Sequence, residues 1–387
     1  MEADILSKSA INGRQPEVCK LLLDEGADVY ALEKYPLKRP IDFAWEVMLA
    51  HQEFHRPFQR IFSDDEYLSE MQLSVLHRII LGLIPRKLED ALALSTIDIN
   101  LGDSEGRTPL SYAAARCDAQ AVKLLLYFGA DPNGRLQNDK GTMSPLHHSA
   151  KSGSVECTRI LLEYHADVKY ADSWGNTALI FAAIYGKSRE LCQLLLEKGA
   201  DISAQDRMGY TPLRAAIMWD SVTVLKFLLD NGAGLDATDE GGYTPLLHAV
   251  WQNRHGCLKA LLRRGANTRV VTTTGQTVLH LAATFGDVET VKILTNATSS
   301  GKLQGVDHAA LDADGHTAED LFKERKIMMP GLCETIKALW NPEMRDVDIK
   351  SVNEMALGVV YTYEDDSGAR SVDIFVDAVE YQDIAGM

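Results

Sequence analysis

One stretch of the sequence matches a catalytic motif letter by letter, Gly102-Asp103-Ser104-Glu105-Gly106. A Gly-x-Ser-x-Gly run is the nucleophile elbow of many hydrolases, in which a strained turn between a buried strand and a helix presents the serine. Here the run falls in frame with two other turns, Asp172–Gly175 and Asp206–Gly209, and no buried parallel sheet is predicted around it. We therefore interpret it as a structural turn and expect no catalytic residue in it.

The histidines are the next candidates for chemistry. His147 and His280 each follow a predicted helix start by three residues, and His148 stands beside His147. No cysteine or carboxylate stands at zinc-ligand spacing from them. The sequence also lacks a phosphate-binding glycine loop ending in Lys-Ser/Thr and a His-Glu-x-x-His pair. We therefore expect no metal, no cofactor and no small-molecule substrate.

The six cysteines include no Cys-x-x-Cys pair. Cys19, Cys157, Cys192 and Cys257 fall among the apolar residues of predicted helices, where cysteine behaves as a small hydrophobe. Buried thiols of this kind are typical of reduced, intracellular proteins. The first residues lack the basic region and apolar run of a secretory signal, and no stretch is apolar enough to cross a membrane. We expect a cytoplasmic or nuclear protein that does not bind membranes.

The composition limits the partners. The net charge is −16 and the isoelectric point is near 5.1. Direct binding to nucleic acid needs a positively charged footprint, so we do not expect it here. The chain is 46% hydrophobic, which is enough for a large core.

The elements that position these residues are best seen in the stretch Asp206–Gly232, which begins with a predicted tight turn. Thr211 suits the cap of a first helix, and Pro212 suits its first position. Apolar residues at helical spacing over 222–229 predict a second helix, and Gly232 suits the left-handed residue that ends it. Neither helix is long enough to be stable alone, so the unit must stack on others.

The same frame recurs at a nearly fixed period. The helix-starting residues follow one another at intervals of about 33 residues, at Thr108, Ser144, Thr177, Thr211, Thr244 and Thr277. Thr-Pro-Leu stands at three of these starts, and Ser144-Pro145-Leu146-His147 is a near match. Gly-Ala-Asp ends the second helix at 129–131 and 199–201. A period in this range is the signature of a solenoid array.

These motifs at this spacing resemble the ankyrin repeat family. The resemblance implies an all-α solenoid in which each repeat is a β-turn finger followed by two antiparallel helices, with the stack curved around a concave surface. It also implies that the histidine after Leu in the helix-start motif, at His147 and His280, bonds within and between repeats.

We expect about ten helix-turn-helix repeats over residues 1–340. Weaker starts at Asp4, Arg39 and Ser74 continue the period toward the amino end. Insertions at 133–143 and 295–311 are expected in surface loops, and the charged outer face of the last repeat is typical of a capping repeat. The expected repeats lie near residues 1–30, 36–65, 71–100, 105–134, 141–170, 174–203, 208–237, 241–270, 274–303 and 314–340.

Residues 341–387 form an acidic tail. From Glu343 onward it holds eleven acidic and three basic residues, yet it includes two apolar-rich runs, 356–363 and 372–381. A hairpin, a short helix and a disordered segment that orders on a partner all fit this mixture.

The informative residues for function are large side chains that the ankyrin frame places on the concave face, at the fingers and at the ends of first helices. In earlier repeats these places are mostly polar, as at Arg116 and Lys151. Exposed Trp, Tyr and Met are typical of the core of an interface. The alternative is that some rings lie flat between neighbouring repeats and fill space. The predicted binding residues are Trp174, Tyr185, Met208, Tyr210, Met218, Trp219, Tyr243, Trp251 and Phe285.

The function favoured by the sequence is that of a non-catalytic adaptor or scaffold that binds a protein partner on the concave face. One alternative is a transcription co-regulator without DNA binding of its own, which uses the acidic tail. A second alternative is an enzyme with a site in the 295–311 insertion.

Overall fold

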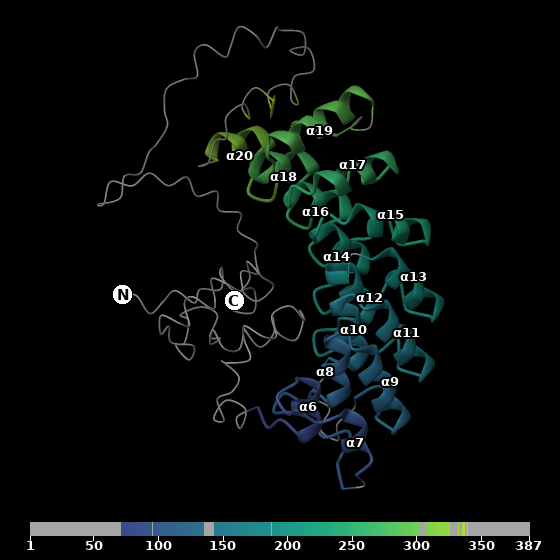
Figure 1. Ribbon diagram of the computed structural model, residues 1–387. Coiled ribbons are helices and arrows are strands. Elements are labelled where there is room, and N and C mark those ends of the chain that lie inside the picture. Colours follow the sequence, from purple (N-terminus) through teal and green to yellow (C-terminus); the bar gives the residue numbers. More distant parts are fainter. Residues whose placement is uncertain are drawn as a thin grey trace, which may run out of the picture.

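The computed structural model describes residues 71–94, 96–134, 143–186, 188–301, 303 and 306–325 and the four positions 332, 335, 336 and 339. Within them, pairs of short helices stack side by side into a curved array (Figure 1). The first helix of each pair lies on the inner, concave side of the curve, and the second lies on the outer side (Figure 1). The fold is therefore the all-α array that the sequence predicts.

The helices alternate between the two sides along the chain. The inner helices are α6 (Val75–Ile80), α8 (Pro109–Ala115), α10 (Pro145–Ser152), α12 (Ala178–Phe181), α14 (Pro212–Met218), α16 (Pro245–Trp251), α18 (Val278–Phe285) and α20 (Ala318–Glu324). The outer helices are α7 (Leu88–Leu92), α9 (Ala119–Tyr127), α11 (Val155–Glu163), α13 (Arg189–Glu197), α15 (Val222–Asp230), α17 (His255–Arg263) and α19 (Val288–Ser299).

The helices begin and end for local reasons that are visible in the sequence. Thr211 is extended, and its side-chain oxygen accepts a hydrogen bond from the backbone N–H of Arg214 (3.3 Å). Pro212 follows at the first helical position, where a missing N–H leaves no bond unmade. After the outer helix α15, Gly232 has a φ of +94°, a left-handed conformation that glycine adopts without steric cost.

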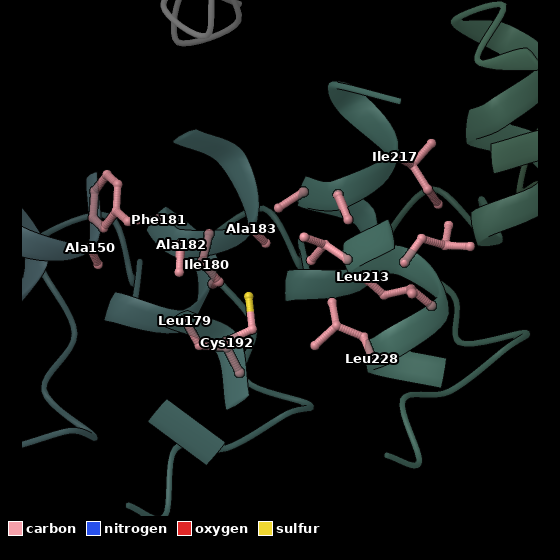
Figure 2. Packing of buried hydrophobic residues seen from close by; sticks show 14 of the residues in the cluster. Ala150, Leu179, Ile180, Phe181, Ala182, Ala183, Cys192, Leu213, Ile217 and Leu228 are labelled. Carbon is pink, nitrogen blue, oxygen red and sulfur yellow. The ribbon is translucent and has the colours of Figure 1, made fainter. Parts of the chain in front are cut away.

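The core is a continuous layer between the inner and outer helices. Leu195 of α13 and Leu228 of α15 are fully buried, as is Ala216 of the inner helix α14. Figure 2 shows Cys192, Leu213 and Leu228 within this layer. Because each described repeat buries its apolar face against its neighbours, the described repeats share one core.

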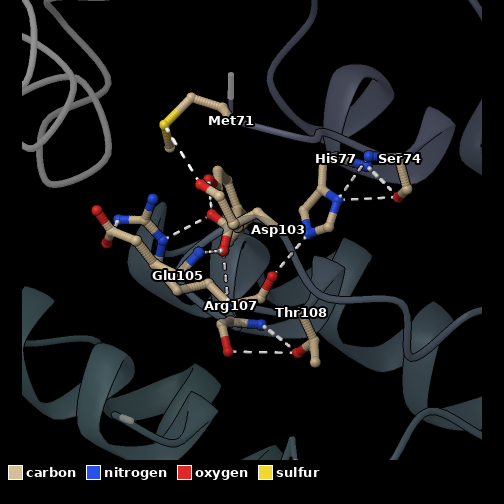
Figure 3. Close-up of polar contacts among 10 residues, drawn as sticks. Met71, Ser74, His77, Asp103, Glu105, Arg107 and Thr108 are labelled. Carbon is tan, nitrogen blue, oxygen red and sulfur yellow. Dashed lines mark hydrogen bonds and ion pairs between the residues drawn. The ribbon is translucent and has the colours of Figure 1, made fainter. Parts of the chain in front are cut away.

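Histidines at the inner helices join neighbouring repeats. Nδ1 of His77 accepts a bond from the N–H of Ser74 (3.1 Å), and Nε2 lies 2.9 Å from the carbonyl oxygen of Arg107 in the next repeat (Figure 3). His280 makes the same two contacts, with the N–H of Thr277 and the carbonyl oxygen of His316, both at 3.1 Å. The expectation that His280 bonds within and between repeats is confirmed.

His147 holds its own repeat in the same way. Its Nδ1 accepts a hydrogen bond from the N–H of Ser144 (3.0 Å). Toward the next repeat its ring packs against Phe181, with 5.4 Å between the ring centroids. The within-repeat bond expected for His147 is therefore present, and an aromatic contact accompanies it at the repeat boundary.

The number of repeats is smaller than expected. The described residues contain seven complete helix pairs, from α6/α7 to α18/α19, and α20 begins an eighth. The prediction of about ten repeats is wrong, and about seven are supported. The segments 1–30 and 36–65, the last part of 314–340 and the tail 341–387 lie outside the described residues. The first two segments keep the period, but neither contains the Thr-Pro-Leu start that stands at Thr108, Thr211 and Thr244.

One inner helix departs from the common pattern. Thr177 caps this helix, α12, and Ser188 caps the next helix, α13. The interval between these two caps is one residue longer than the corresponding interval from Thr211 to Ser221 in the following repeat. The additional residue is absorbed in a π-helical turn, Ala182–Gly186, directly after α12. This turn, which carries Tyr185, explains why the whole repeat is slightly longer than the one that follows it.

Among the helices of the described ranges, none is long and apolar enough to cross a membrane.

Candidate protein-binding surface

The nine predicted binding residues lie on the fingers and inner helices, and they differ in exposure. Five are exposed: Trp174 (61%), Tyr185 (47%), Trp219 (45%), Met208 (43%) and Phe285 (41%). The other four, Tyr210, Met218, Tyr243 and Trp251, are half-buried. We call these nine residues the aromatic stripe. The sequence allowed two interpretations of these rings, binding to a partner and packing between repeats, and both apply. The first five offer surface to a partner, while the other four also fill space between repeats.

Ring contacts connect the stripe across repeat boundaries. The rings of Tyr185 and Trp219 lie 6.4 Å apart and link the π turn after α12 to the end of α14. The rings of Trp251 and Phe285 lie 6.2 Å apart and link α16 to α18. Within one repeat, Tyr243 and Trp251 lie 5.7 Å apart. The stripe therefore contains two groups of ring contacts, one on the repeats that start at Thr177 and Thr211 and one on the repeats that start at Thr244 and Thr277. Between them, the ring of Tyr210 meets the buried imidazole of His248 edge-on, with 6.3 Å between the centroids.

The most exposed ring of the stripe stands on a finger with a fixed backbone. Oδ1 of Asp172 accepts hydrogen bonds from the N–H groups of Trp174 (2.9 Å) and Asn176 (2.8 Å), which closes the turn. The carbonyl oxygen of Trp174 accepts a bond from the N–H of Arg207 in the next finger (2.8 Å). Trp174 is thus presented without the backbone freedom of an ordinary loop, which reduces the entropic cost of binding.

A buried polar cluster lies beneath the half-buried rings. Nε2 of His248 lies 2.7 Å from Oδ2 of Asp239 and 2.9 Å from Nε of Arg214. The imidazole stacks on Tyr243 (5.2 Å) and lies 5.9 Å from Trp251. Because His248 is 2% exposed and Arg214 is 6% exposed, the cluster supports the stripe from inside the array.

One nitrogen atom cannot donate a proton to Asp239 and accept one from Arg214 at the same time. We assign the proton of Nε2 to the bond with Asp239, because a bond to a carboxylate is the stronger of the two. Burial lowers the pKa of His248 despite this bond. Burial alone would raise the pKa of Asp239, but hydrogen bonds from His248 and from the N–H of Tyr243 lower it overall. The pair is therefore a neutral imidazole and an ionised carboxylate at neutral pH.

This cluster was not predicted from the sequence, although its signals were present there. Arg214 occupies the place that His147 and His280 take in their own repeats, and His248 stands one position further along its helix. Asp239 precedes His248 by nine residues, as Asp103 precedes Tyr112, whose hydroxyl donates to Oδ2 of Asp103 (2.6 Å). Comparison of these places across repeats would have indicated a contact between inner helix and turn.

The catalytic motif is a finger turn in the structure. Oδ1 of Asp103 accepts bonds from the N–H groups of Glu105 (2.9 Å) and Arg107 (2.8 Å) (Figure 3). The hydroxyl of Ser104 donates to Sδ of Met71 (3.9 Å). His77 lies nearby, but its ring nitrogens bond Ser74 and the carbonyl oxygen of Arg107. This geometry provides neither the strand–helix elbow nor a general base for Ser104.

Three side chains that could bind a metal ion also belong to a finger turn. Asp312, Asp314 and His316 place their ligand atoms within 4.8 Å of one another. Oδ1 of Asp312 accepts bonds from the N–H groups of Asp314 (3.0 Å) and His316 (2.9 Å), the same pattern as in the other fingers. The turn thus accounts for the position of these groups.

The comparisons with known proteins identify the class. The family described as "Ankyrin repeats (3 copies)" matches residues 133–206 and 190–272, and the family "Ankyrin repeat" matches residues 105–138 and 274–300. Together these matches cover half of the chain. The chain therefore belongs to the ankyrin repeat family.

Individual relatives match this chain over about a third of its length. The chain is 36% identical over 119 residues to the transient receptor potential channel pyrexia of Drosophila melanogaster. This match covers 31% of this chain and 12% of that protein. The chain is 33% identical over 132 residues to human SH3 and multiple ankyrin repeat domains protein 2, covering 34% of this chain and 7% of that protein. It thus matches only a small part of the length of these relatives.

A solved structure supports the fold. The crystal structure of the human ASB11 ankyrin repeat domain resembles this chain with a TM-score of 0.51 and 28% sequence identity. The similarity covers 60% of this chain and 98% of the ASB11 domain.

Proposed function

We propose that this chain is a non-catalytic adaptor or scaffold that binds a segment of another protein along the aromatic stripe. Ankyrin repeats typically mediate protein–protein interaction, which favours a protein as the partner. The observation that carries the proposal is the exposure of Trp174, Tyr185 and Trp219 on three successive repeats. Large aromatic side chains held exposed on a rigid scaffold are typical of binding hot spots.

The place of the stripe in the array supports the same conclusion. The apolar side chains that hold neighbouring repeats together lie between inner and outer helices, as Leu195 and Leu228 do. Trp219 is 45% exposed at the end of its helix, so it contributes less to that layer than a buried leucine does. Its exposed ring area is better explained by binding than by folding.

The co-regulator function remains a second candidate because the segment from Glu343 onward combines eleven acidic residues with apolar runs. In that case the stripe would bind a DNA-binding protein, and the tail would recruit further proteins. We place either function inside the cell, in the cytoplasm or the nucleus, in agreement with the free, buried thiols of Cys157, Cys192 and Cys257.

Affinity capture with quantitative mass spectrometry tests the proposal. The full chain and its Trp219→Ala variant serve as baits in the same cell extract. Tyr127→Ala is the matched control, because Tyr127 is an aromatic residue with 76% exposure at the end of the outer helix α9. Proteins that bind the wild type and the control but not Trp219→Ala are partners of the stripe. A set of bound proteins that is the same for all three baits would contradict the proposal.

A further inference from the structure

The segment 372–384 of the acidic tail has an apolar spacing that suits the stripe. In VDIFVDAVEYQDI the residues at every third position from Val372 are apolar, namely Val372, Phe375, Ala378, Tyr381 and Ile384, and three further residues, Ile374, Val376 and Val379, are apolar as well. In a polyproline II conformation, which has three residues per turn and rises about 3.1 Å per residue, the residues at every third position share one face at intervals of about 9 Å. Packed helices lie about 8–10 Å apart. An extended segment of this sequence would therefore offer about one apolar side chain to each repeat.

The charges of the two surfaces are compatible. Nζ of Lys151 lies 5.4 Å from the centroid of the Tyr185 ring, and Arg207 is exposed beside Met208. Asp206, a carboxylate of the same finger, accepts hydrogen bonds from the N–H groups of Met208 (2.9 Å) and Tyr210 (2.8 Å), and Glu240 is an exposed acidic residue of the next finger. The segment carries four acidic residues and no basic residue, at Asp373, Asp377, Glu380 and Asp383. Lys151 and Arg207 thus bring positive charge to the stripe of a chain whose net charge is −16.

The chain is long enough for the segment to reach the stripe. Leu339 is buried, and the chain between it and Val372 spans as much as about 100 Å, at up to about 3.3 Å per residue. The three steps from α18 to α12 take only about 30 Å at the usual helix spacing. A tethered segment of this kind has an effective concentration in the millimolar range. Even an intrinsic Kd of about 100 μM would then keep it bound in about nine chains of ten.

We propose that residues 372–384 bind along the aromatic stripe of their own chain, with the period-three apolar side chains facing Tyr185, Trp219 and the rings of the next two repeats. The inference rests on the proposed function in one respect, namely that the stripe is a binding surface. It adds regulation, because an external partner has to displace the tail. Loss of the tail contact therefore strengthens partner binding.

Fluorine NMR of the full chain labelled with 5-fluorotryptophan tests the contact. The stripe holds three of the five tryptophans, Trp174, Trp219 and Trp251. In the double variant Phe375→Asp/Tyr381→Asp, the three stripe resonances are expected to shift. The matched control, Val360→Asp/Tyr363→Asp, adds the same charge to the other apolar run of the tail and should leave the stripe resonances in place. Unchanged stripe resonances in the first variant, or equal shifts in both, would overturn the proposal.

A peptide of residues 370–387 provides the converse test. Added to the Phe375→Asp/Tyr381→Asp chain, it should restore the wild-type resonances. The wild-type chain should respond only at a peptide concentration at least about tenfold higher, because its own tail competes at millimolar effective concentration. A peptide that restores nothing would overturn the proposal. A photo-crosslinker placed at position 375 should give crosslinks within one chain to α12–α18, and crosslinked dimers in their place would overturn intramolecular binding.

The two proposals fail separately. If the stripe resonances do not respond to the tail substitutions while Trp219→Ala still loses captured partners, only the tail contact is wrong. If the resonances respond and capture does not depend on Trp219, the adaptor function at the stripe is wrong and the tail contact stands.

Discussion

Nε2 of His248 lies 2.7 Å from Oδ2 of Asp239, in the same repeat and directly beneath the rings of Tyr243 and Trp251. The other carboxylate oxygen of Asp239 accepts bonds from the N–H groups of Gly241 (3.0 Å) and Tyr243 (2.9 Å). One side chain thus fixes the finger turn and also holds the imidazole that supports two rings of the stripe.

Replacement of Asp239 separates these two tasks. Asp239→Asn keeps a side-chain oxygen that accepts the bonds of the turn, and it places an amide NH2 group opposite Nε2 of His248. Nε2 then accepts a hydrogen bond from this amide, which requires the tautomer of His248 with its proton on Nδ1. We expect this variant to lose about 1 kcal/mol of unfolding free energy, since a charge-assisted bond becomes a neutral one. Asp239→Ala loses the turn bonds as well and should cost at least about 2 kcal/mol. Urea unfolding measures both, and equal losses in the two variants would contradict the double role.

The buried histidines predict a loss of stability in mild acid. Burial lowers the pKa of His77 and His147 from 6.5 to about 4 in the folded chain. Between these values the unfolded chain binds more protons than the folded chain, so the free energy of unfolding falls as the pH falls from 6.5 toward 4. The slope is about 1.4 kcal/mol per pH unit for each such histidine, and these groups have no effect above their unfolded pKa.

Urea midpoints between about pH 7.5 and about pH 5 test this expectation. His147→Asn removes one titrating group, and its amide oxygen still faces the N–H of Ser144. The variant should therefore show a flatter decline than the wild type over this range. A decline of unchanged slope would show that His147 does not contribute.

The thiols give a prediction about chemical reactivity. Cys117 is exposed, whereas Cys157, Cys192 and Cys257 are buried. Burial raises the pKa of Cys157 to about 11 and that of Cys192 to about 12, so neither forms the reactive thiolate near neutral pH. In a Cys19→Ser/Cys333→Ser chain, one thiol should react quickly with a disulfide reagent at about pH 8 and three only after denaturation. Fast reaction of a second thiol in the folded chain would contradict the buried positions.

Much of the fold was predictable because its determinants are local and repeated. Thr211, Pro212 and Gly232 each act within a few residues, and their recurrence gives the class of fold directly. The fixed period also explains the error in the repeat count, because the expected start at Arg39 rested mainly on spacing. The extra residue before Ser188 was visible as a slightly longer interval between helix starts, but its accommodation as a π turn depends on packing.

The sequence predicted on which side of the array the stripe residues lie, but not how exposed each side chain is. Repeat register places Trp219 and Tyr243 on the inner side of the array, yet it does not tell an exposed ring from a half-buried one. That difference comes from contacts between repeats, such as the stacking of His248 on Tyr243, which depends on both the finger and the next inner helix. Contacts of this kind are specific to one pair of repeats and do not follow from a consensus.

Core truncation tests whether the array behaves as a linear stack. Leu195 and Leu228 are fully buried in α13 and α15, so Leu195→Ala or Leu228→Ala should cost about 2–5 kcal/mol. Because a repeat contacts mainly its neighbours, amide hydrogen exchange should accelerate around the substituted repeat and much less at α8 or α18. Uniform acceleration along α8–α19 would indicate a single cooperative unit instead.

Binding and stability can be separated within the stripe, because its rings differ in exposure. Trp219 is 45% exposed, and Trp251 is half-buried against Tyr243 and His248. Truncation of an aromatic hot spot costs about 2 kcal/mol or more, so Trp219→Ala should weaken the captured partner about thirtyfold and barely move the thermal midpoint. Trp251→Ala should also weaken binding, but it additionally loses ring contacts worth about 0.5–1.5 kcal/mol each, and its midpoint should fall. Tyr127→Ala, on the outer side of the array, should change neither quantity. Calorimetric titration of the captured partner together with thermal unfolding of each variant gives both numbers. If Trp219→Ala lowers the midpoint and leaves the affinity intact, the ring serves packing between repeats, and the partner binds elsewhere.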